Sequence, residues 1–168
     1  MTGALAVAAA AFEEALEELG MSDADLQLVD PAQFGRRAAL LAAGDAIWSQ
    51  HLGPLLDGKR VQQLLGVGTR QAVNDLYRRQ RLLGLPTKDD KVVYAAFQFA
   101  ATGRPHPAIP EVLRLFKDVV ASPYTAASWF VSPQPLLEGH APAEWLRQGR
   151  NADLVKEAAR RSAARLGQ

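Results

Sequence analysis

The sequence predicts a mainly α-helical protein: a helix-turn-helix with a small β-hairpin wing, followed by a small helical domain. Two short amphipathic helical patterns meet at a glycine-containing turn within residues 57–80. Two apolar runs then flank a charged turn between residues 82 and 94. Residues 122–166 contain further helical patterns bounded by Pro and Gly. Together these patterns indicate two helical parts with a hairpin between them.

The helix-turn-helix prediction comes from residues 57–80. Val61, Leu64 and Leu65 give the first helix one apolar face. Gly66 can adopt the left-handed conformation that ends a helix, and Thr69 can cap the helix that follows. We expect this second helix from about residue 69 to 80. Its apolar positions recur at helical spacing and are Ala72, Val73, Leu76 and Tyr77.

The other side of the second helix is polar, and we predict that it contacts DNA through Arg70, Gln71, Asn74, Arg78 and Arg81. Arg can pair bidentately with guanine in a major groove, and Asn or Gln with adenine. Residues 58–91 contain eight Lys or Arg and three Asp, a net charge of +5 in a chain whose total is +1. Such clustering neutralises phosphates. The alternative is a purely structural helical hairpin with a solvated basic face.

The hairpin wing is predicted from the residues that follow. Residues 82–86 form an apolar strand, residues 88–91 a charged turn, and residues 92–94 the returning strand. Because such a turn would lie near the DNA backbone, Lys88 joins the predicted DNA-binding residues. Asp89 and Asp90 leave open the alternative of a solvent-exposed hairpin tip.

The chain divides into four predicted parts. Residues 1–35 contain seven acidic side chains and no Lys or Arg, and form an acidic arm whose helix ends at Gly20. Residues 36–101 form the DNA-binding region, and its support helix is expected to bury Leu40, Leu41, Ile47 and Trp48. Residues 102–110 hold three prolines and form an extended connector. Residues 111–168 form the helical domain.

Several classes of function are excluded by composition. The chain has no Cys and its three His stand far apart, so no metal or cofactor site is predicted. No apolar run reaches 18 residues, and the Ala-rich start lacks a basic region, which predicts a cytoplasmic protein that does not span a membrane. No nucleophile-base pair or Gly-rich phosphate loop is present, so we do not expect an enzyme. The nearest approach to a catalytic cluster is Glu138-Gly139-His140.

The C-terminal pattern resembles the toxin-binding domain of the Xre/MbcA/ParS family of bacterial antitoxins. The matching residues are Trp129, Pro133, Leu137, Gly139, Pro142, Leu146, Gly149 and Val155. Phe130 replaces the usual Leu of the family. Upstream, a Leu-Gly-Val segment before Arg-Gln-x-Val, and a later Tyr-Pro-x-x-Gln-Phe signature with Ala95 in place of the Pro, also match. The resemblance covers roughly residues 55–160.

The resemblance implies an antitoxin that neutralises a RES-domain toxin, an enzyme that degrades NAD, and that represses its own promoter. The residues expected to face the toxin are Arg147, Arg150, Arg160, Arg161 and Arg165, with the chain after Ala159 as a weakly held tail. Truncation after Asn151 should then abolish neutralisation and spare DNA binding. We expect a homodimer on operator DNA and a higher hetero-oligomer with the toxin. The alternatives are a stand-alone helix-turn-helix transcriptional regulator and arginines that merely solvate a terminal helix.

Overall fold

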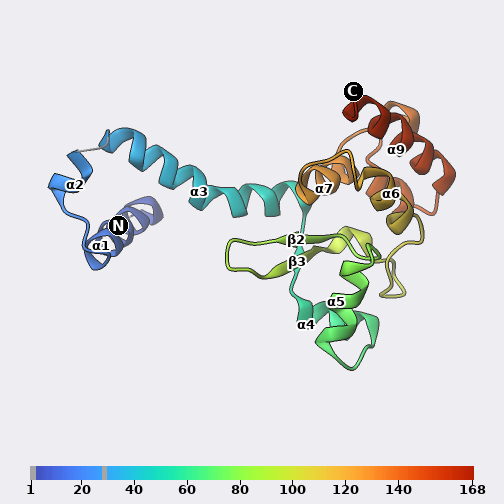
Figure 1. Ribbon diagram of the computed structural model, residues 1–168, viewed down its shortest axis with the longest axis horizontal. Coiled ribbons are helices and arrows are strands. Elements are labelled where there is room, and N and C mark those ends of the chain that lie inside the picture. The colour runs from blue at the N-terminus through green and yellow to red at the C-terminus, as the bar shows by residue number, and fades with distance from the viewer. Residues whose placement is uncertain (1–2, 28–29) are drawn as a thin grey trace. The chain divides into compact units, whose positions relative to one another are not determined.

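The fold is taken from a computed structural model that describes residues 3–27 and 30–168, apart from the side chains of residues 33, 36, 37, 40–43 and 45. The chain divides into two compact units, Met1–Ala46 and Ile47–Gln168 (Figure 1). The described residues form a mainly helical structure with a small antiparallel sheet, as predicted. Within the described part, no helix has the length and apolar character needed to span a membrane.

The first unit contains α1 (Ala4–Glu18), α2 (Asp23–Gln27) and most of α3 (Pro31–Leu52). The predicted N-terminal helix is confirmed, and Gly20 follows it with a φ of +75°. Ser22 caps α2, because its hydroxyl oxygen accepts from the Asp25 N–H at 3.4 Å, while its own backbone N–H donates to the Asp25 carboxylate at 2.9 Å. No residue of α1 is buried, and its Leu5 side chain is 88% exposed.

The predicted burial of α3 is only partly described. Ile47 is 57% exposed, so its predicted burial was wrong. Trp48 is half-buried and packs 4.9 Å from the Tyr124 ring. The predicted burial of Leu40 and Leu41 falls on side chains outside the described part. The end of α3 is fixed within the second unit by Leu52 in the core and by His51, whose Nε2 lies 2.8 Å from the Ser128 hydroxyl.

The helix-turn-helix consists of α4 (Gly58–Leu65) and α5 (Arg70–Arg78). Asp57 caps α4 by accepting a hydrogen bond of 2.7 Å from the Arg60 N–H. Gly66 ends α4 in the left-handed conformation, with a φ of 67°. The Thr69 hydroxyl then caps α5 by accepting from the Ala72 N–H at 3.2 Å. Both turn predictions are therefore confirmed.

The sheet has three antiparallel strands in the order β1-β3-β2. The predicted hairpin is β2 (Gly84–Pro86) paired with β3 (Val92–Ala95), and Leu85 lies opposite Val93. The third strand, β1 (Leu55–Leu56), was not predicted and pairs with β3 on its other side. A short 3-10 helix, η1 (Ala96–Gln98), follows β3.

The sheet separates two apolar clusters, because successive side chains of a strand point to opposite faces. Leu82 and Tyr94 belong to the cluster that holds α4 and α5, together with Val61 and Val73. Leu83, Leu85 and half-buried Val93 pack instead with the helices that follow. In Figure 1 these two sets of helices lie on either side of the hairpin. A single hairpin therefore supplies both clusters.

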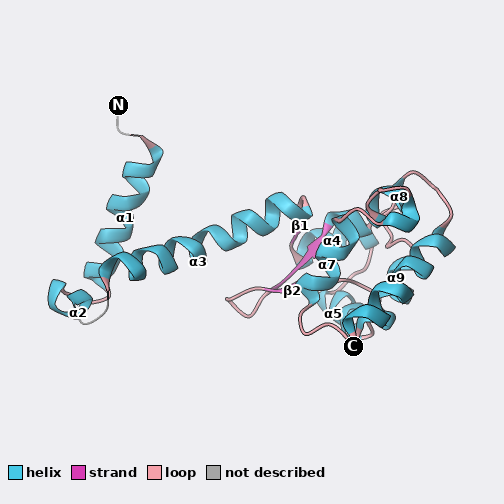
Figure 2. Cartoon of the chain, turned by 90° about the horizontal axis from the view of Figure 1, so that it is seen from above, coloured by secondary structure: helices cyan, strands magenta, loops and turns pink. Residues whose placement is uncertain are grey.

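The helices after the sheet are α6 (Ala108–Phe116), α7 (Pro123–Val131), α8 (Pro142–Arg147) and α9 (Ala152–Leu166), with the 3-10 helix η2 (Pro135–Leu137) before α8. Figure 2 labels α7, α8 and α9 among them. The expected extended connector 102–110 is shorter, because Ala108 to Pro110 already form the first turn of α6. It also does not separate two units, since residues 47–168 form one.

The last helix differs from the predicted weakly held tail. Ala159 is fully buried and Ser162 is buried, and the Trp129 indole N–H donates to the Ser162 hydroxyl at 2.9 Å. Val155 and Ala158 on the same helix are also buried. Because α9 contributes to the core, truncation after Asn151 would expose apolar side chains and cannot test partner binding selectively.

Candidate nucleic-acid interface

The predicted DNA-contacting residues lie on three neighbouring segments. Arg70, Gln71, Asn74 and Arg78 belong to α5, Arg81 follows the helix, and Lys88 lies in the turn between β2 and β3. All are exposed except Asn74, which is half-buried. The structure therefore places the first four on one helix and leaves Arg81 and Lys88 on separate loops.

The exposed face of α5 is cationic and largely unengaged. The Arg70, Arg78 and Arg81 guanidinium groups make no ion pair or side-chain hydrogen bond with the described residues. Gln71 is different, because its Nε2 donates to the Asp75 carboxylate at 3.0 Å. The N-terminus of α5 adds N–H groups and the positive end of the helix dipole. This face is therefore suited to polyanions.

The position of α5 is set by Tyr77 and Gly84. A Cβ atom added at Gly84 would lie 2.5 Å from the Tyr77 ring, so the helix approaches the strand only because residue 84 has no side chain. The Tyr77 ring also meets the Tyr94 ring edge-on, with centroids 6.2 Å apart and an interplanar angle of 89°. Val73 is buried beneath the helix. These contacts fix α5 against the hairpin.

The base of the hairpin is fixed by Gln98, which is fully buried. Its Oε1 accepts from the Leu83 N–H at 2.8 Å, and its Nε2 donates to the carbonyls of Leu83 and Ala95, each at 3.0 Å. Gln98 was not predicted from the sequence to have this role. The sequence signal for this role is that Gln98 is a polar residue within the otherwise apolar run 95–99.

The outer end of the hairpin is held by a different contact. The Tyr124 hydroxyl, on α7, donates to the Pro86 carbonyl at 3.0 Å. Beyond it the turn is closed by the Thr87 N–H, which donates to the Lys91 carbonyl at 2.8 Å, and by Asp90 with a φ of 56°. The predicted charged turn is thus a short, exposed tip that includes Lys88.

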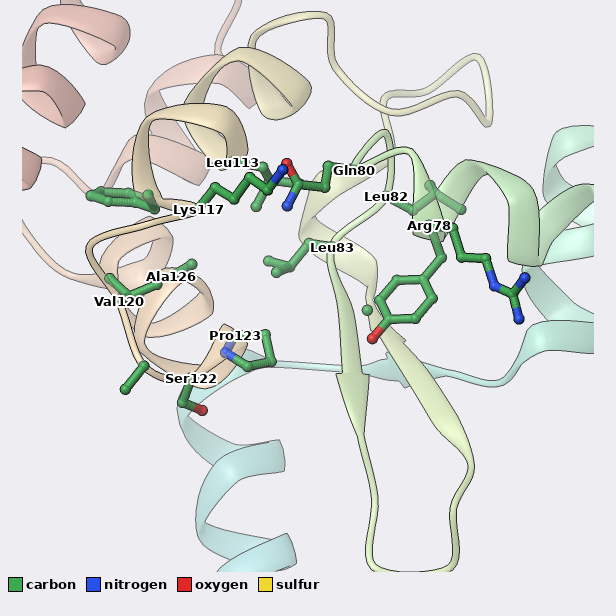
Figure 3. Close-up of a pocket in the computed structure, with 14 residues that line it drawn as sticks. Arg78, Gln80, Leu82, Leu83, Leu113, Lys117, Val120, Ser122, Pro123 and Ala126 are labelled. Carbon is green, nitrogen blue, oxygen red and sulfur yellow. The ribbon is translucent and has the colours of Figure 1, made fainter.

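A cavity of about 400 Å³ lies behind α5 (Figure 3). Its walls include Leu82, Leu83 and Leu113, and in Figure 3 the Arg78 side chain extends away from these apolar residues. The outward direction of Arg78 leaves its guanidinium group accessible.

The arginines predicted to face a toxin lie on α8, on α9 and, for Arg150, in the loop between them. Arg150 stacks on the Trp145 ring, 3.4 Å from its centroid, and pairs with Glu138 at 2.9 Å. This ion pair lowers the pKa of the Glu138 carboxyl. Three others contact side chains within α9: Arg160 and Arg161 both pair with Glu157, and Arg165 donates to Ser162. Arg147 is exposed at the end of α8.

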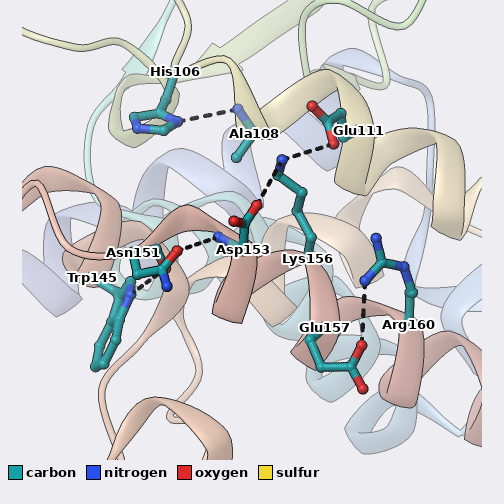
Figure 4. A network of polar contacts seen from close by, with 9 residues as sticks. All are labelled: His106, Ala108, Glu111, Trp145, Asn151, Asp153, Lys156, Glu157 and Arg160. Carbon is teal, nitrogen blue, oxygen red and sulfur yellow. Dashed lines mark hydrogen bonds and ion pairs between the residues drawn. The ribbon is translucent and has the colours of Figure 1, made fainter.

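The remaining polar clusters are surface contacts. Glu138 and His140 do not form a catalytic pair, since Glu138 meets Arg150 and His140 lies 3.7 Å from Glu144. Lys156 bridges Glu111 at 3.1 Å and Asp153 at 3.2 Å (Figure 4). Over the described positions, no group of three or more metal-binding side chains comes together.

The comparisons with known proteins bear on the fold. No protein-family model matches the chain, and no curated protein matches it. A solved structure described as "NMR structure of Rv2175c" is similar, with a TM-score of 0.54 and 23% sequence identity. The similarity covers 67% of this chain and 81% of that one. At this level of identity, the likeness shows a shared fold.

Proposed function

We propose that this protein binds double-stranded DNA through α5 and regulates transcription from the site it occupies. The observation that carries the proposal is the unpaired cationic face of α5, held on a rigid base by Tyr77 and Val73. In this arrangement α5 enters the major groove, where Arg70 and Asn74 read base edges. Arg78 and Arg81 contact phosphates, and Lys88 at the hairpin tip contacts the backbone beside the groove.

The DNA-bound form is proposed to be a homodimer, because a two-fold dimer matches a palindromic operator. The first unit supports this with exposed apolar side chains, among them Leu5 and Val7 on α1 and Leu19 just after it. A second chain that covers them would bury apolar surface.

Fluorescence anisotropy with a duplex from the region upstream of the gene tests DNA binding. Arg70→Ala/Arg78→Ala should weaken binding by about 1–3 kcal/mol through the loss of the base-reading Arg70 side chain. Loss of the Arg78 phosphate contact should weaken it further. The matched control is Arg147→Ala/Arg161→Ala, which removes two exposed charges from the helices after the sheet and should bind like wild type. Equal affinity of the Arg70→Ala/Arg78→Ala protein and wild type, with both folded by circular dichroism, would reject the assignment.

An antitoxin role is a second proposal, and it is supported by the Trp129-to-Val155 motif together with exposed arginines on α8 and α9. The proposed partner is a RES-domain toxin encoded beside this gene. Charge reversal at exposed sites, Arg147→Glu/Arg161→Glu, tests it without removing core residues. Coexpression with the toxin should show copurification with wild type and loss of copurification and of cell protection with the variant. Full protection by the variant would mean that these arginines do not face the toxin.

A further inference from the structure

A second cavity, of about 700 Å³, lies between the end of α5, the loop at 104–107 and α6. Four arginines line it, and they are Arg79, Arg81, Arg104 and Arg114. Leu65, Val67 and Leu76 contribute apolar walls, and three prolines line its rim from the loop and from α6. The cavity therefore combines four cationic side chains with a partly apolar wall.

The positive charge in this cavity is not neutralised by the protein. None of the four guanidinium groups forms an ion pair or a side-chain hydrogen bond within residues 3–27 and 30–168 as described. Glu111 is the only acidic residue among those that line the cavity, and Lys156 already pairs with it at 3.1 Å. Figure 4 shows Lys156 between Glu111 and Asp153. The four side chains are exposed, so an anion from solution can reach them.

The backbone around the cavity is fixed by local hydrogen bonds. Gln80 ends α5 with a left-handed φ of 56°, and the Arg81 N–H donates back to the Leu76 carbonyl at 2.9 Å. On the opposite side, Gly103 has a φ of +79° and an added Cβ would lie 2.6 Å from the Leu64 carbonyl oxygen. The Ala100 N–H donates to the Arg104 carbonyl at 2.8 Å. The arginines thus project from an ordered frame.

We propose that this cavity binds a phosphorylated small molecule of nucleotide size. Guanidinium groups match phosphate oxygens bidentately and stay charged at every physiological pH. The volume falls in the range of roughly 300–1,000 Å³ that is usual for small-ligand sites. Leu65, Val67 and Leu76 offer apolar surface to the uncharged body of the ligand, while the arginines hold its phosphates.

The cavity adjoins the surface proposed to bind DNA and shares Arg81 with it, but it does not include the side chains proposed to read bases. Arg70, Gln71 and Asn74, near the start of α5, do not line it, whereas Arg79 and Arg81, after its end, do. Arg104 and Arg114 lie on later segments altogether. Ligand binding at the end of α5 would also bias the position of the helix on DNA. This effect of the ligand on DNA binding rests on the proposed function, whereas the binding of the ligand does not.

Isothermal titration calorimetry on the full chain without DNA tests ligand binding, with ATP, inorganic pyrophosphate and adenosine as probes. ATP should bind most tightly, pyrophosphate more weakly, and adenosine at least about a hundredfold more weakly than ATP. Arg104→Ala/Arg114→Ala should weaken ATP binding by about tenfold or more, since removal of each guanidinium takes away charge-assisted hydrogen bonds. Arg104→Lys/Arg114→Lys should bind ATP more tightly than the alanine variant but less tightly than wild type. Lysine keeps the positive charge but lacks the planar guanidinium group that binds phosphate bidentately.

Lys59→Ala/Lys117→Ala is the matched control, because it removes two positive charges outside this cavity and should retain ATP affinity. The proposal is overturned if the control and the cavity variant lose the same affinity, or if adenosine binds as tightly as ATP. It is also overturned if ATP does not bind while a 12-base-pair duplex does and depends on Arg104 and Arg114, since the cavity would then be a DNA surface. Loss of DNA binding with retained ATP binding would reject only the proposed DNA-binding function.

Discussion

The Gln98 side-chain amide hydrogen-bonds to both backbone polar groups of Leu83. It accepts from the N–H at 2.8 Å and donates to the carbonyl at 3.0 Å. A side chain thus imitates the pairing of a neighbouring strand at the point where the chain enters the hairpin. Because Leu83 and Gln98 are both buried, water cannot replace these bonds.

Gln98→Leu should therefore destabilise the protein despite its apolar character. The Leu83 N–H would lose its partner in the interior, which costs about 1–3 kcal/mol. Urea denaturation followed by circular dichroism measures the change in the free energy of unfolding. Gln50→Leu, at an exposed position of α3, is the control and should change stability little. Equal stability of both variants would contradict the role assigned to Gln98.

Gly84→Ala should displace α5 from the hairpin. The new Cβ would lie 2.5 Å from the Tyr77 ring and 2.7 Å from a Val92 methyl carbon, and relief of such overlap costs about 1–3 kcal/mol. Thermal unfolding should show a lower midpoint, and DNA affinity should fall as well. Gly58→Ala, where an added Cβ meets no atom within 4 Å, should not lower the midpoint. A Gly84→Ala protein as stable as wild type would show that the packing relaxes freely.

Lys88→Ala should change the salt dependence of DNA binding more than its sequence preference. Removal of one phosphate contact lowers the slope of log K against log [salt] by about 0.9 and weakens all sequences alike. Arg70→Ala should instead reduce discrimination between operator and unrelated duplex. Anisotropy titrations at several salt concentrations separate the two effects. An unchanged slope for Lys88→Ala would place the hairpin tip in solvent, away from the DNA.

Stability should decrease on mild acidification because of His106. Burial, with a smaller contribution from the Lys156 charge, lowers the pKa of His106 below its ordinary value of 6.5. Its Nδ1 also accepts from the Ala108 N–H at 3.1 Å, which requires an unprotonated nitrogen. The unfolded chain therefore binds the proton more readily, and this contribution to stability is complete above pH 6.5 and decreases below it.

Urea midpoints measured between about pH 7.5 and 5.5 test this dependence. The lowered pKa values of Glu138 and Glu157 lie below the ordinary 4.5, so those carboxylates stay ionised throughout this window. His106→Asn keeps an acceptor for the N–H two residues on and should flatten the profile. If the variant shows the same loss at low pH as wild type, another group is responsible.

Self-association should depend on the exposed apolar residues on α1 and at Leu19 just after it. Leu5→Ser/Leu19→Ser replaces side chains that are 88% and 78% exposed, so the free energy of unfolding of the single chain should change little. Multi-angle light scattering should give a dimer for wild type and a monomer for the variant. Leu166→Ser, an exposed leucine at the end of α9, is the matched control. A monomeric wild type at roughly tens of micromolar, alone and with operator DNA, would count against the proposed dimer.

The elements predicted best from the sequence are those set by local chemistry. Gly66 and Thr69 delimit α4 and α5 through their own backbone and side-chain hydrogen bonds, so no distant residue is needed to place them. The hairpin likewise follows from two short apolar runs, 82–86 and 92–94, on either side of a charged turn. The polar face of α5 was predicted for the same reason, since helical spacing alone groups its side chains.

The features that the sequence did not reveal depend on distant contacts. Leu82 and Leu83 are adjacent leucines, yet they belong to different clusters, and only the sheet pairing shows this. Ala159 is fully buried, but an alanine followed by two arginines gives little indication in the sequence that the position is buried. Arg104 and Arg114 were not predicted as site residues because they meet Arg79 and Arg81 only in the folded chain.

The motif residues after Ser122 illustrate the same distinction. Leu137, Leu146 and Val155 are buried, and Gly139 and Gly149 have positive φ values of 81° and 70°. These positions are explained by packing and by turns. They therefore constrain the fold of this region more strongly than they identify a partner surface.

The contact between Tyr124 and Pro86 also affects how these molecules can meet. β2 is an edge strand of the sheet, and an unpaired edge is a template for strand addition from another chain. Pro86 has no N–H to offer, and its carbonyl already accepts from the Tyr124 hydroxyl. The strand is also only three residues long. The β2 edge is thus a poor template for intermolecular β-pairing, which disfavours edge-to-edge aggregation at this strand.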